Sequence, residues 1–356
     1  MTGHACTGSC PLVASRKPYY RELAAGRTYL WCACGRSKRQ PFCDGRSHEG
    51  TGFEPIRYTA TKDGEEVLFC GCKHTATAPF CDGAHSNLAG GYRDEGEAAD
   101  GPRPAIVAAD AAGVARVDGR CFVISPEAEA DASARYSLRT LISPSRGSEH
   151  QSQFHLMLRD GATPVLAAPG VDAILWVRAG EGEVEIGSRR LGFAGPCGIY
   201  VRAGEAFRLH ATAPIKAYVS ACPGVEQLDE LADMPEYFDA VWPDRIVPID
   251  ESERTAMGPR WFQMLVDKTI GSTTAAQFIG HIPKSRAEMH RHLYEEALII
   301  MSGEGIIWNE GSAARVGAGD VIFFPRKHLH SLECTSAEGM DVVGLIHPGD
   351  NPGINY

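Results

Sequence analysis

The feature that most constrains this chain is a cysteine pattern that occurs twice between residues 32 and 85. In each copy, one residue separates the first two cysteines, and eight residues separate the second from a third. Pro-Phe precedes the third cysteine, and Asp-Gly and then a histidine follow it. The first copy comprises Cys32, Cys34, Cys43 and His48, and the second comprises Cys70, Cys72, Cys81 and His85. Three thiolates and one imidazole at a repeated spacing indicate two metal sites.

The residue types leave two kinds of site open. Structural zinc is commonly held by three cysteines and one histidine. A [2Fe–2S] cluster also takes four protein ligands, and histidine can replace cysteine on an iron. The single residue between the first two cysteines is shorter than the C-x2-C spacing typical of zinc sites, which favours the cluster. Asp44 and Asp82 can cap a helix, so we expect a helix to begin at each site with its positive end toward the metal.

Both copies resemble the CDGSH, or NEET-type, iron–sulfur motif. Together they resemble the tandem NEET proteins of the inner mitochondrial type and their bacterial relatives. The resemblance extends over roughly residues 18–90. It implies two [2Fe–2S] clusters as cofactors, each bound by the three cysteines and the histidine of one copy. His48 stands one residue later than the family's histidine, with Arg46 as the additional residue.

The remainder of the chain predicts β structure. Short runs of Val, Ile, Leu and aromatic residues alternate with Gly and Pro, which is typical of a sandwich or barrel. A repeat at an offset of 123 residues relates Gly180 and Gly182 to Gly303 and Gly305, which indicates two barrels. The expected domains are a tandem iron–sulfur domain (1–92), a linker (93–114), a first barrel (115–225), a helical connection (226–246) and a second barrel (247–356).

The second barrel contains a set of candidate metal ligands. His290 and His292 are two residues apart, so on a strand their side chains face the same side. Glu296 and His330 can join them in the barrel interior. Three imidazoles and a carboxylate suit Fe, Mn, Ni, Cu or Zn.

This pattern resembles the cupin superfamily, whose first motif is H-x-H-x3-E-x6-G and whose second is G-x5-P-x-G-x2-H. Lys327 stands where the second motif has its glycine. The resemblance implies two jelly-roll barrels and one divalent metal, which we take to be Fe(II), bound by His290, His292, Glu296 and His330. The first barrel has Ala167, Pro169 and Ala173 at the matching positions, so we expect a degenerate cupin without metal.

The combination predicts an iron–sulfur-dependent non-haem metal oxidoreductase. The leading hypothesis is an O2-dependent oxygenase or oxidase on a small polar molecule, with two clusters passing electrons to a mononuclear iron. Glu296, His328 and Tyr294 are its candidate catalytic residues. Two alternatives remain: a redox sensor or cluster-transfer protein with a ligand-binding cupin, and a non-redox cupin isomerase or lyase.

The charge and residue composition of the chain limit the kinds of partner that we expect it to bind. Residues 1–92 carry 11 Lys+Arg and 8 Asp+Glu, and the remainder carries 24 and 37, for a formal net charge of −10. An acidic chain without a long apolar run is expected to bind neither nucleic acid nor membrane. Six cysteines outside the two copies, taken as free thiols, predict a cytoplasmic protein. We expect a small-molecule substrate and a ferredoxin or flavin reductase as electron source. The cupin resemblance also implies a homodimer.

Overall fold

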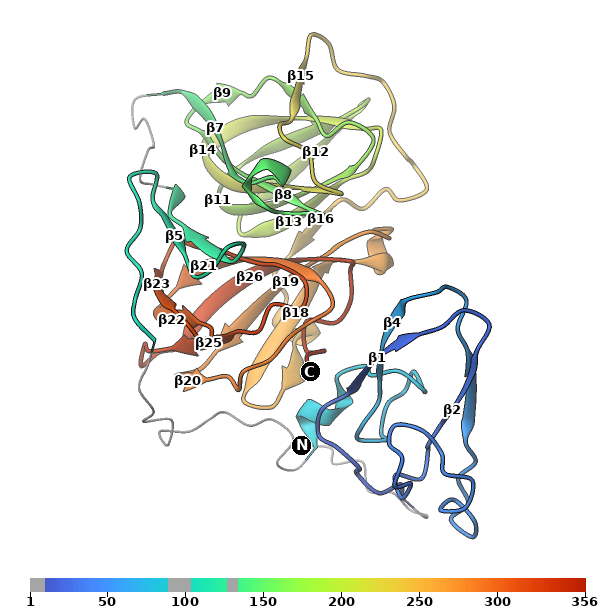
Figure 1. Ribbon diagram of the computed structural model, residues 1–356. Coiled ribbons are helices and arrows are strands. Elements are labelled where there is room, and N and C mark those ends of the chain that lie inside the picture. The colour runs from blue at the N-terminus through green and yellow to red at the C-terminus, as the bar shows by residue number, and fades with distance from the viewer. Residues whose placement is uncertain (1–9, 89–103, 127–133) are drawn as a thin grey trace. The chain divides into compact units, whose positions relative to one another are not determined.

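The computed structural model describes residues 10–88, 104–126 and 134–356 (Figure 1). The chain divides into two units, one of residues Met1–Arg93 with Asn351–Tyr356, and the other of residues Asp94–Asp350. Both units are built from antiparallel strands. Helical structure in the described ranges is limited to the 3-10 turns η1 (Ala84–Asn87), η3 (Pro144–Arg146), η4 (Glu251–Glu253) and η5 (Lys268–Ile270). In this part of the chain no helix is long and apolar enough to cross a membrane.

The first unit consists of two short two-stranded sheets and the two cysteine loops. Strand β1 (Tyr19–Leu23) pairs with β4 (Glu65–Phe69), and β2 (Thr28–Trp31) pairs with β3 (Ile56–Thr59). Trp31 and Phe69 end strands β2 and β4 and are fully buried immediately before the first cysteine of each copy. The C-terminal residues belong to the same unit, where the ring of Tyr356 stacks on Tyr20 at 5.3 Å.

The first barrel has one continuous sheet around an apolar interior. Val, Ile, Leu and Phe side chains from its strands fill this interior, including Leu175, Val184 and Phe207 at 0% exposure. Its strands are β7 (Tyr136–Ile142), β8 (Ser152–Leu158), β9 (Gly161–Ala162), β10 (Val165–Ala167), β11 (Asp172–Ile186), β12 (Arg189–Ala194), β13 (Cys197–Val201), β14 (Ala206–Cys222), β15 (Asp229–Leu231) and β16 (Ile246–Pro248).

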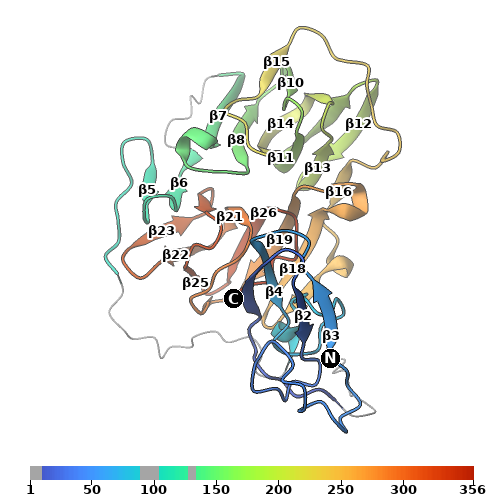
Figure 2. The ribbon, with the colours of Figure 1, turned by 45° about the vertical axis from the view of Figure 1, so that its right-hand side comes forward.

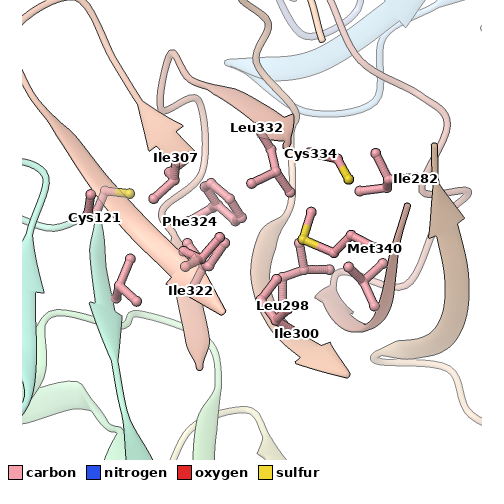
Figure 3. Close-up of a cluster of buried hydrophobic side chains, with 14 of the residues drawn as sticks. Cys121, Ile282, Leu298, Ile300, Ile307, Ile322, Phe324, Leu332, Cys334 and Met340 are labelled. Atoms are coloured by element: carbon pink, nitrogen blue, oxygen red, sulfur yellow. The ribbon is translucent and has the colours of Figure 1, made fainter. Parts of the chain in front are cut away.

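The second barrel consists of an eight-stranded and a four-stranded sheet. The larger sheet has the order β17-β18-β19-β26-β21-β24-β6-β5, and the smaller has the order β20-β25-β22-β23. The bounds are β5 (Val114–Arg116), β6 (Phe122–Ile124), β17 (Thr255–Met257), β18 (Arg260–Val266), β19 (Ala276–Ile282), β20 (Ser285–Arg286), β21 (Glu295–Ser302), β22 (Glu304–Trp308), β23 (Ala313–Gly317), β24 (Val321–Phe324), β25 (Ser331–Cys334) and β26 (Met340–His347). Figure 3 shows part of the core between them, where Phe324, Ile307, Leu332 and Met340 are buried together.

The two barrels exchange strands reciprocally. Strand β6 precedes the first barrel in sequence but pairs with β24 of the second. Strand β16 precedes the second barrel but pairs with β13 of the first (Figure 2). Each exchanged strand covers the edge of a sheet that would otherwise expose unpaired backbone groups. The expected first-barrel range of 115–225 is therefore wrong at its start, because Ala115–Ile124 belongs to the second barrel's sheet.

Two further boundary predictions need correction. The expected helix at 226–246 is absent from this described segment, which contains β15 and otherwise irregular chain. Pro235 and Pro243 lack the backbone N–H that a helix needs, and Arg245, at the end of the segment, forms a buried ion pair with Glu205 at 2.6 Å. The expected linker is described only from residue 104, and there Val107 donates its N–H to the carbonyl of Ala313 on β23.

The internal repeat of the barrels has a steric basis. A Cβ atom at Gly182 would lie 2.0 Å from the carbonyl oxygen of His210, and one at Gly305 would lie 2.1 Å from that of Glu333. Both positions thus require glycine because a neighbouring strand approaches the backbone closely.

Candidate metal centres

The two cysteine loops have matching backbone structure. In the first, the N–H of Cys32 donates to the carbonyl of Pro41 at 2.9 Å, and in the second, Cys70 donates to Pro79 at 2.9 Å. Gly45 and Gly83 both have φ of 86°, which permits the turn after the third cysteine. The short helix η1 follows this turn only in the second loop, and the first loop continues as turns, so the prediction of a helix at each site is wrong for the first.

Asp44 and Asp82 accept hydrogen bonds from the backbone of these turns, but neither is the helix N-cap that was predicted, because the first loop has no helix and the N-cap of η1 is Gly83. The carboxylate of Asp44 accepts hydrogen bonds from the N–H groups of Arg46 and Ser47 at 3.1 and 2.9 Å. The carboxylate of Asp82 accepts from Ala84 at 3.0 Å. Bonds from Ser47, by its hydroxyl and N–H, hold the pKa of Asp44 well below its usual range.

The four candidate ligands of each loop lie as two pairs. Within the cysteine pairs, the sulfur atoms are 3.6 Å apart in the first loop and 3.5 Å apart in the second. Within the cysteine–histidine pairs, Sγ and Nδ1 are 3.4 Å apart in both loops. Two ligands bonded at about 2.1–2.3 Å to one tetrahedral metal ion lie roughly 3.6–3.8 Å apart. Each pair therefore fits one metal ion, and two pairs fit the two irons of a [2Fe–2S] cluster.

The extra residue in the first loop does not displace its histidine. His48 Nδ1 lies as far from Cys43 as His85 Nδ1 lies from Cys81, at 3.4 Å in both cases. The turn absorbs Arg46 as an exposed residue. The two histidines thus occupy equivalent positions despite their different spacing from the third cysteine.

The two sites differ in their exposure to solvent. In the second, Cys81 and His85 are 8% and 5% exposed, and burial lowers the pKa of His85. In the first, Cys43 is only partly buried and the side chain of His48 is 19% exposed. A cluster in the first site would therefore meet solvent through its cysteine–histidine end.

A buried tryptophan and a buried lysine connect the two loops. The indole N–H of Trp31, the residue before Cys32, donates to the carbonyl of Cys70 at 3.0 Å. The ammonium of Lys73 donates to the same carbonyl at 3.0 Å and lies 4.7 Å from the centre of the Trp31 ring. Burial lowers the pKa of Lys73 to about 8, while the thiols of Cys32 and Cys70 raise it. The amine thus lies within electrostatic range of ligands from both sites.

In the second barrel, the three predicted histidines come together. His290 and His330 exchange backbone hydrogen bonds at 3.0 and 3.1 Å, which sets two segments far apart in sequence side by side. The ring of His330 lies 4.5 Å from that of His290 and 4.9 Å from that of His292, measured between centroids. His292 and His330 are 1% and 2% exposed.

All three rings are held in the same tautomer. The Nδ1 atoms of His290, His292 and His330 lie 2.8, 2.8 and 2.9 Å from the carbonyl oxygens of Glu288, Tyr294 and His328. A carbonyl can only accept, so each Nδ1 carries the hydrogen and each neutral ring keeps its lone pair on Nε2. Burial and the neighbouring histidines lower the pKa of His330 well below its usual value, which keeps that ring neutral.

This arrangement suits a metal ion chemically. His292 Nε2 is buried without a hydrogen-bond partner and lies 3.3 Å from Glu296 Oε2. Backbone carbonyls bonded to the opposite nitrogen are the usual support of a histidine ligand. In the described ranges no three His, Cys, Asp or Glu side chains already form a group that could hold one ion, so coordination would draw these rings closer together.

The structure explains why the second cupin motif has a glycine where this chain has Lys327. Lys327 has φ of 62°, in the left-handed region that favours glycine. Its N–H donates to the carbonyl of His292 at 2.9 Å, and its own carbonyl accepts from Arg291 at 3.1 Å. Among the residues with described backbone, Lys73 is the other non-glycine residue with positive φ, and it too adjoins a candidate ligand.

The remaining predicted catalytic residues lie beside the histidines. Tyr294 is 5% exposed and stacks on His292 at 4.1 Å, so it supports the orientation of that ring. The ring of His328 stacks at 5.9 Å from that of His330, and its Nε2 is hydrogen-bonded to Asp118. Asp118, in the loop before β6, was missed from the sequence because 210 residues separate it from His328.

Glu295, the neighbour of Glu296, has a different role. Its fully buried carboxylate accepts hydrogen bonds from the N–H groups of Glu149 and His150, both at 2.8 Å, and from the hydroxyl of Ser148 at 3.0 Å. Adjacent residues on a strand face opposite sides. Glu295 therefore joins β21 to the segment before β8, while Glu296 faces the histidines.

Not all cysteines outside the two loops are free thiols, contrary to the prediction. Cys10 is in a disulfide bond. The other described cysteines outside the two loops are Cys121, Cys197, Cys222 and Cys334, and all four are free and buried.

Comparisons with known proteins agree with the fold. Residues 280–345 match the family model of the cupin domain, and this range contains His290, His292, Glu296 and His330. The chain is therefore mainly β and contains a cupin domain joined to a small cysteine-rich unit.

The cysteine-rich part is homologous to CDGSH iron–sulfur proteins over a short stretch. It is 56% identical over 52 residues to CDGSH iron-sulfur domain-containing protein 3, mitochondrial, of Mus musculus, a match covering 14% of this chain and 37% of that protein. The protein of that name from Homo sapiens is 55% identical over 51 residues, covering 14% and 39%. The chain thus spans well under half the length of these curated relatives.

Solved structures of low sequence identity align with about two thirds of the chain. The 11S allergen from Cocos nucifera aligns with a TM-score of 0.51 at 10% identity, covering 65% of this chain and 90% of that chain. Protein Ylba from E. coli aligns with a TM-score of 0.49 at 14% identity, covering 68% and 93%. A variant oxalate decarboxylase from Bacillus subtilis aligns with a TM-score of 0.46 at 13% identity, covering 70% and 78%.

Proposed function

We propose that this chain is an iron–sulfur-dependent non-haem metal oxidoreductase acting with O2 on a small polar molecule. The observation that carries the proposal is the presence, on one chain, of two sets of paired cysteine and histidine ligands and of three histidines with Nε2 lone pairs beside a carboxylate. Each set of pairs would hold one [2Fe–2S] cluster, and the cupin histidines with Glu296 would hold Fe(II).

The roles of the clusters and of the cupin iron follow from the number of electrons that each cluster can carry. A [2Fe–2S] cluster carries one electron, and an iron with an open position supports O2 chemistry. Two clusters would thus store the two electrons that a monooxygenation takes from outside. The protein's own part is to keep His290, His292 and His330 neutral and oriented, since imidazole binds metal only when its ligating nitrogen is unprotonated.

Residues beside the ligands have supporting roles in this proposal. Tyr294 packs its ring against His292 and provides the carbonyl that fixes its tautomer. His328, bonded to Asp118, provides the carbonyl that fixes His330. A small-molecule substrate would bind beside these residues.

The test starts with metal and sulfide content of protein purified without oxygen. About five iron and four sulfide per chain are expected, with His330→Ala losing one iron and keeping all sulfide. Reduced clusters mixed with O2 should then reoxidise several-fold more slowly in His330→Ala than in the wild type. Equal reoxidation rates in His330→Ala and the wild type would contradict the proposal, as would zinc in place of sulfide at the cysteine sites.

A second candidate function is favoured by the exposure of Cys43 and His48. An exposed cysteine–histidine end would make the first cluster transferable or sensitive to oxidants, with the cupin as a ligand-binding module. Under this function, cluster transfer to an apo-ferredoxin would proceed from the wild type, and His330→Ala would leave both transfer and reoxidation unchanged.

A further inference from the structure

The loop of the first cysteine site has exposed positive charges that the second lacks. Its four exposed cations are Arg36, Lys38, Arg39 and Arg46. The positions of the second loop that match Arg36, Lys38 and Arg39 hold His74, Ala76 and Thr77, and Arg46 is the additional residue of the first loop. The one lysine of the second loop, Lys73, is buried. None of the four exposed cations pairs with a residue that the structure describes, so their charge is directed to solvent.

The same loop contains the ligands that reach solvent. Cys43 and His48 are partly exposed, whereas Cys81 and His85 of the second site are buried. Electron transfer between proteins is fastest where the cofactor lies nearest the surface. Exposed candidate ligands and a group of exposed cations therefore coincide in the first loop, whereas the second loop has buried ligands and no exposed Lys or Arg of its own.

We infer that this cationic loop is the docking face for an acidic electron-carrier protein of the plant-type ferredoxin class. The inference deepens the proposed function, since it requires that a cluster occupy the first site. The chain as a whole has a formal charge of −10, so an acidic carrier would be repelled on average and attracted locally at this loop. In the transfer, one electron passes from the carrier's reduced cluster to the oxidised cluster of the loop, and no bond forms or breaks.

A weak, electrostatically guided encounter fits this arrangement. Redox partners typically form small interfaces whose association rate depends on complementary charge. Arginine and lysine on one loop can guide approach without a large apolar patch. The carrier would then lie against the end of the site formed by Cys43 and His48.

The experiment measures reduction of the full-length protein by a reduced plant-type ferredoxin in a stopped-flow instrument at low ionic strength. The test variant is Lys38→Glu/Arg39→Glu. The matched control is Arg57→Glu/Lys62→Glu, which reverses two exposed cations of the same unit outside both ligand loops. The second-order rate constant should fall about tenfold or more in the test variant and less than about twofold in the control. Added salt should slow the wild type and leave the test variant nearly unchanged.

A neutral reductant separates docking from cluster damage. Photoreduced deazaflavin should reduce all three proteins at the same rate. If Lys38→Glu/Arg39→Glu loses its clusters, the charge-neutral Lys38→Gln/Arg39→Gln takes its place, with an expected slowing of several-fold.

Two outcomes would overturn the inference: an unchanged ferredoxin rate in the test variant, or equal slowing in the control. Failure of the proposed function is distinguishable. If electrons never reach the cupin, reoxidation by O2 does not depend on His330, but the reduction rates measured here keep their pattern.

Discussion

The indole of Trp31 and the carbonyl of Cys70 form a 3.0 Å hydrogen bond between the two cysteine loops. Trp31 immediately precedes Cys32 in the chain, so this bond connects the neighbour of a candidate ligand in the first loop to Cys70, a candidate ligand in the second. Lys73 donates to the same carbonyl. The two loops are therefore joined through one buried polar contact with three participants.

Replacing Trp31 by phenylalanine should weaken this connection. The substitution keeps an aromatic ring but removes the N–H donor, and a typical buried hydrogen bond contributes about 1 kcal/mol. We expect the free energy of unfolding of the first unit to fall by about that amount or somewhat more. Urea denaturation of the metal-free protein, followed by near-UV circular dichroism, measures the change. An unchanged midpoint and slope would contradict the assigned contact.

Replacing Lys73 by methionine should shift the reduction potentials of both clusters to more negative values. Reduction adds negative charge to a cluster. The buried ammonium of Lys73 would stabilise this charge at both sites, because it interacts electrostatically with both Cys32 and Cys70. The shift should be on the order of tens of millivolts, since the charge acts through a poorly screened interior. Spectroelectrochemical titration gives both potentials. Lys73→Arg, which keeps the charge, is the control, and a shift confined to one cluster would argue against a shared cation.

Glu295 and Glu296 should respond in opposite ways to the same substitution. Glu295→Gln disturbs a buried carboxylate with three donors, so it should lower the free energy of unfolding by roughly 1–3 kcal/mol and leave metal content unchanged. Glu296→Gln should lower affinity for the cupin metal and affect stability of the metal-free protein little. Thermal denaturation and metal analysis of both variants test this. The assignment fails if the two variants lose metal equally.

The stability of variants at position 327 should depend on how readily the new residue adopts the left-handed backbone conformation found there. Lys327→Gly relieves the left-handed strain, at the expense of greater freedom in the unfolded chain, so stability should stay within about 1 kcal/mol of the wild type. Lys327→Val should be about 1–2 kcal/mol less stable, because a β-branched residue rarely adopts this conformation. Chemical denaturation compares the two. Equal stability of both variants would show that the turn can relax.

Local patterns in the sequence identify the candidate ligands, which the structure brings close together, but they do not reveal the long-range pairings. The two-residue spacing of His290 and His292 and the repeated cysteine loops are local features, although these histidines lie in the irregular segment between β20 and β21 and not on a strand as expected. The bond of Asp118 to His328 and the donors of Glu295 join segments 210 and about 145 residues apart, which no periodicity encodes.

The strand exchange was missed for a related reason. β6 has the composition of any buried strand, and which barrel it joins depends on which sheet edge is open. The expected helix at 226–246 did not form, and Pro235 and Pro243, which lack the N–H that a helix needs, already argued against it in the sequence. The buried ion pair of Arg245 with Glu205 joins residues 40 positions apart, which local patterns do not reveal.

The cysteine-rich unit includes the last six residues of the chain, so its structure depends on both the N-terminal and the C-terminal segment. Asn351 donates a 3.0 Å hydrogen bond to the carbonyl of Asp82 and lies next to Gly83, in the turn between two candidate ligands. Ile354 is also buried, at 5% exposure. A fragment ending at residue 93 would contain every cysteine of both loops and still lack part of its own core. Separating the two units by cleavage would therefore change the cysteine-rich unit itself. Studying that unit alone requires residues 351–356 as an added peptide or a fused segment.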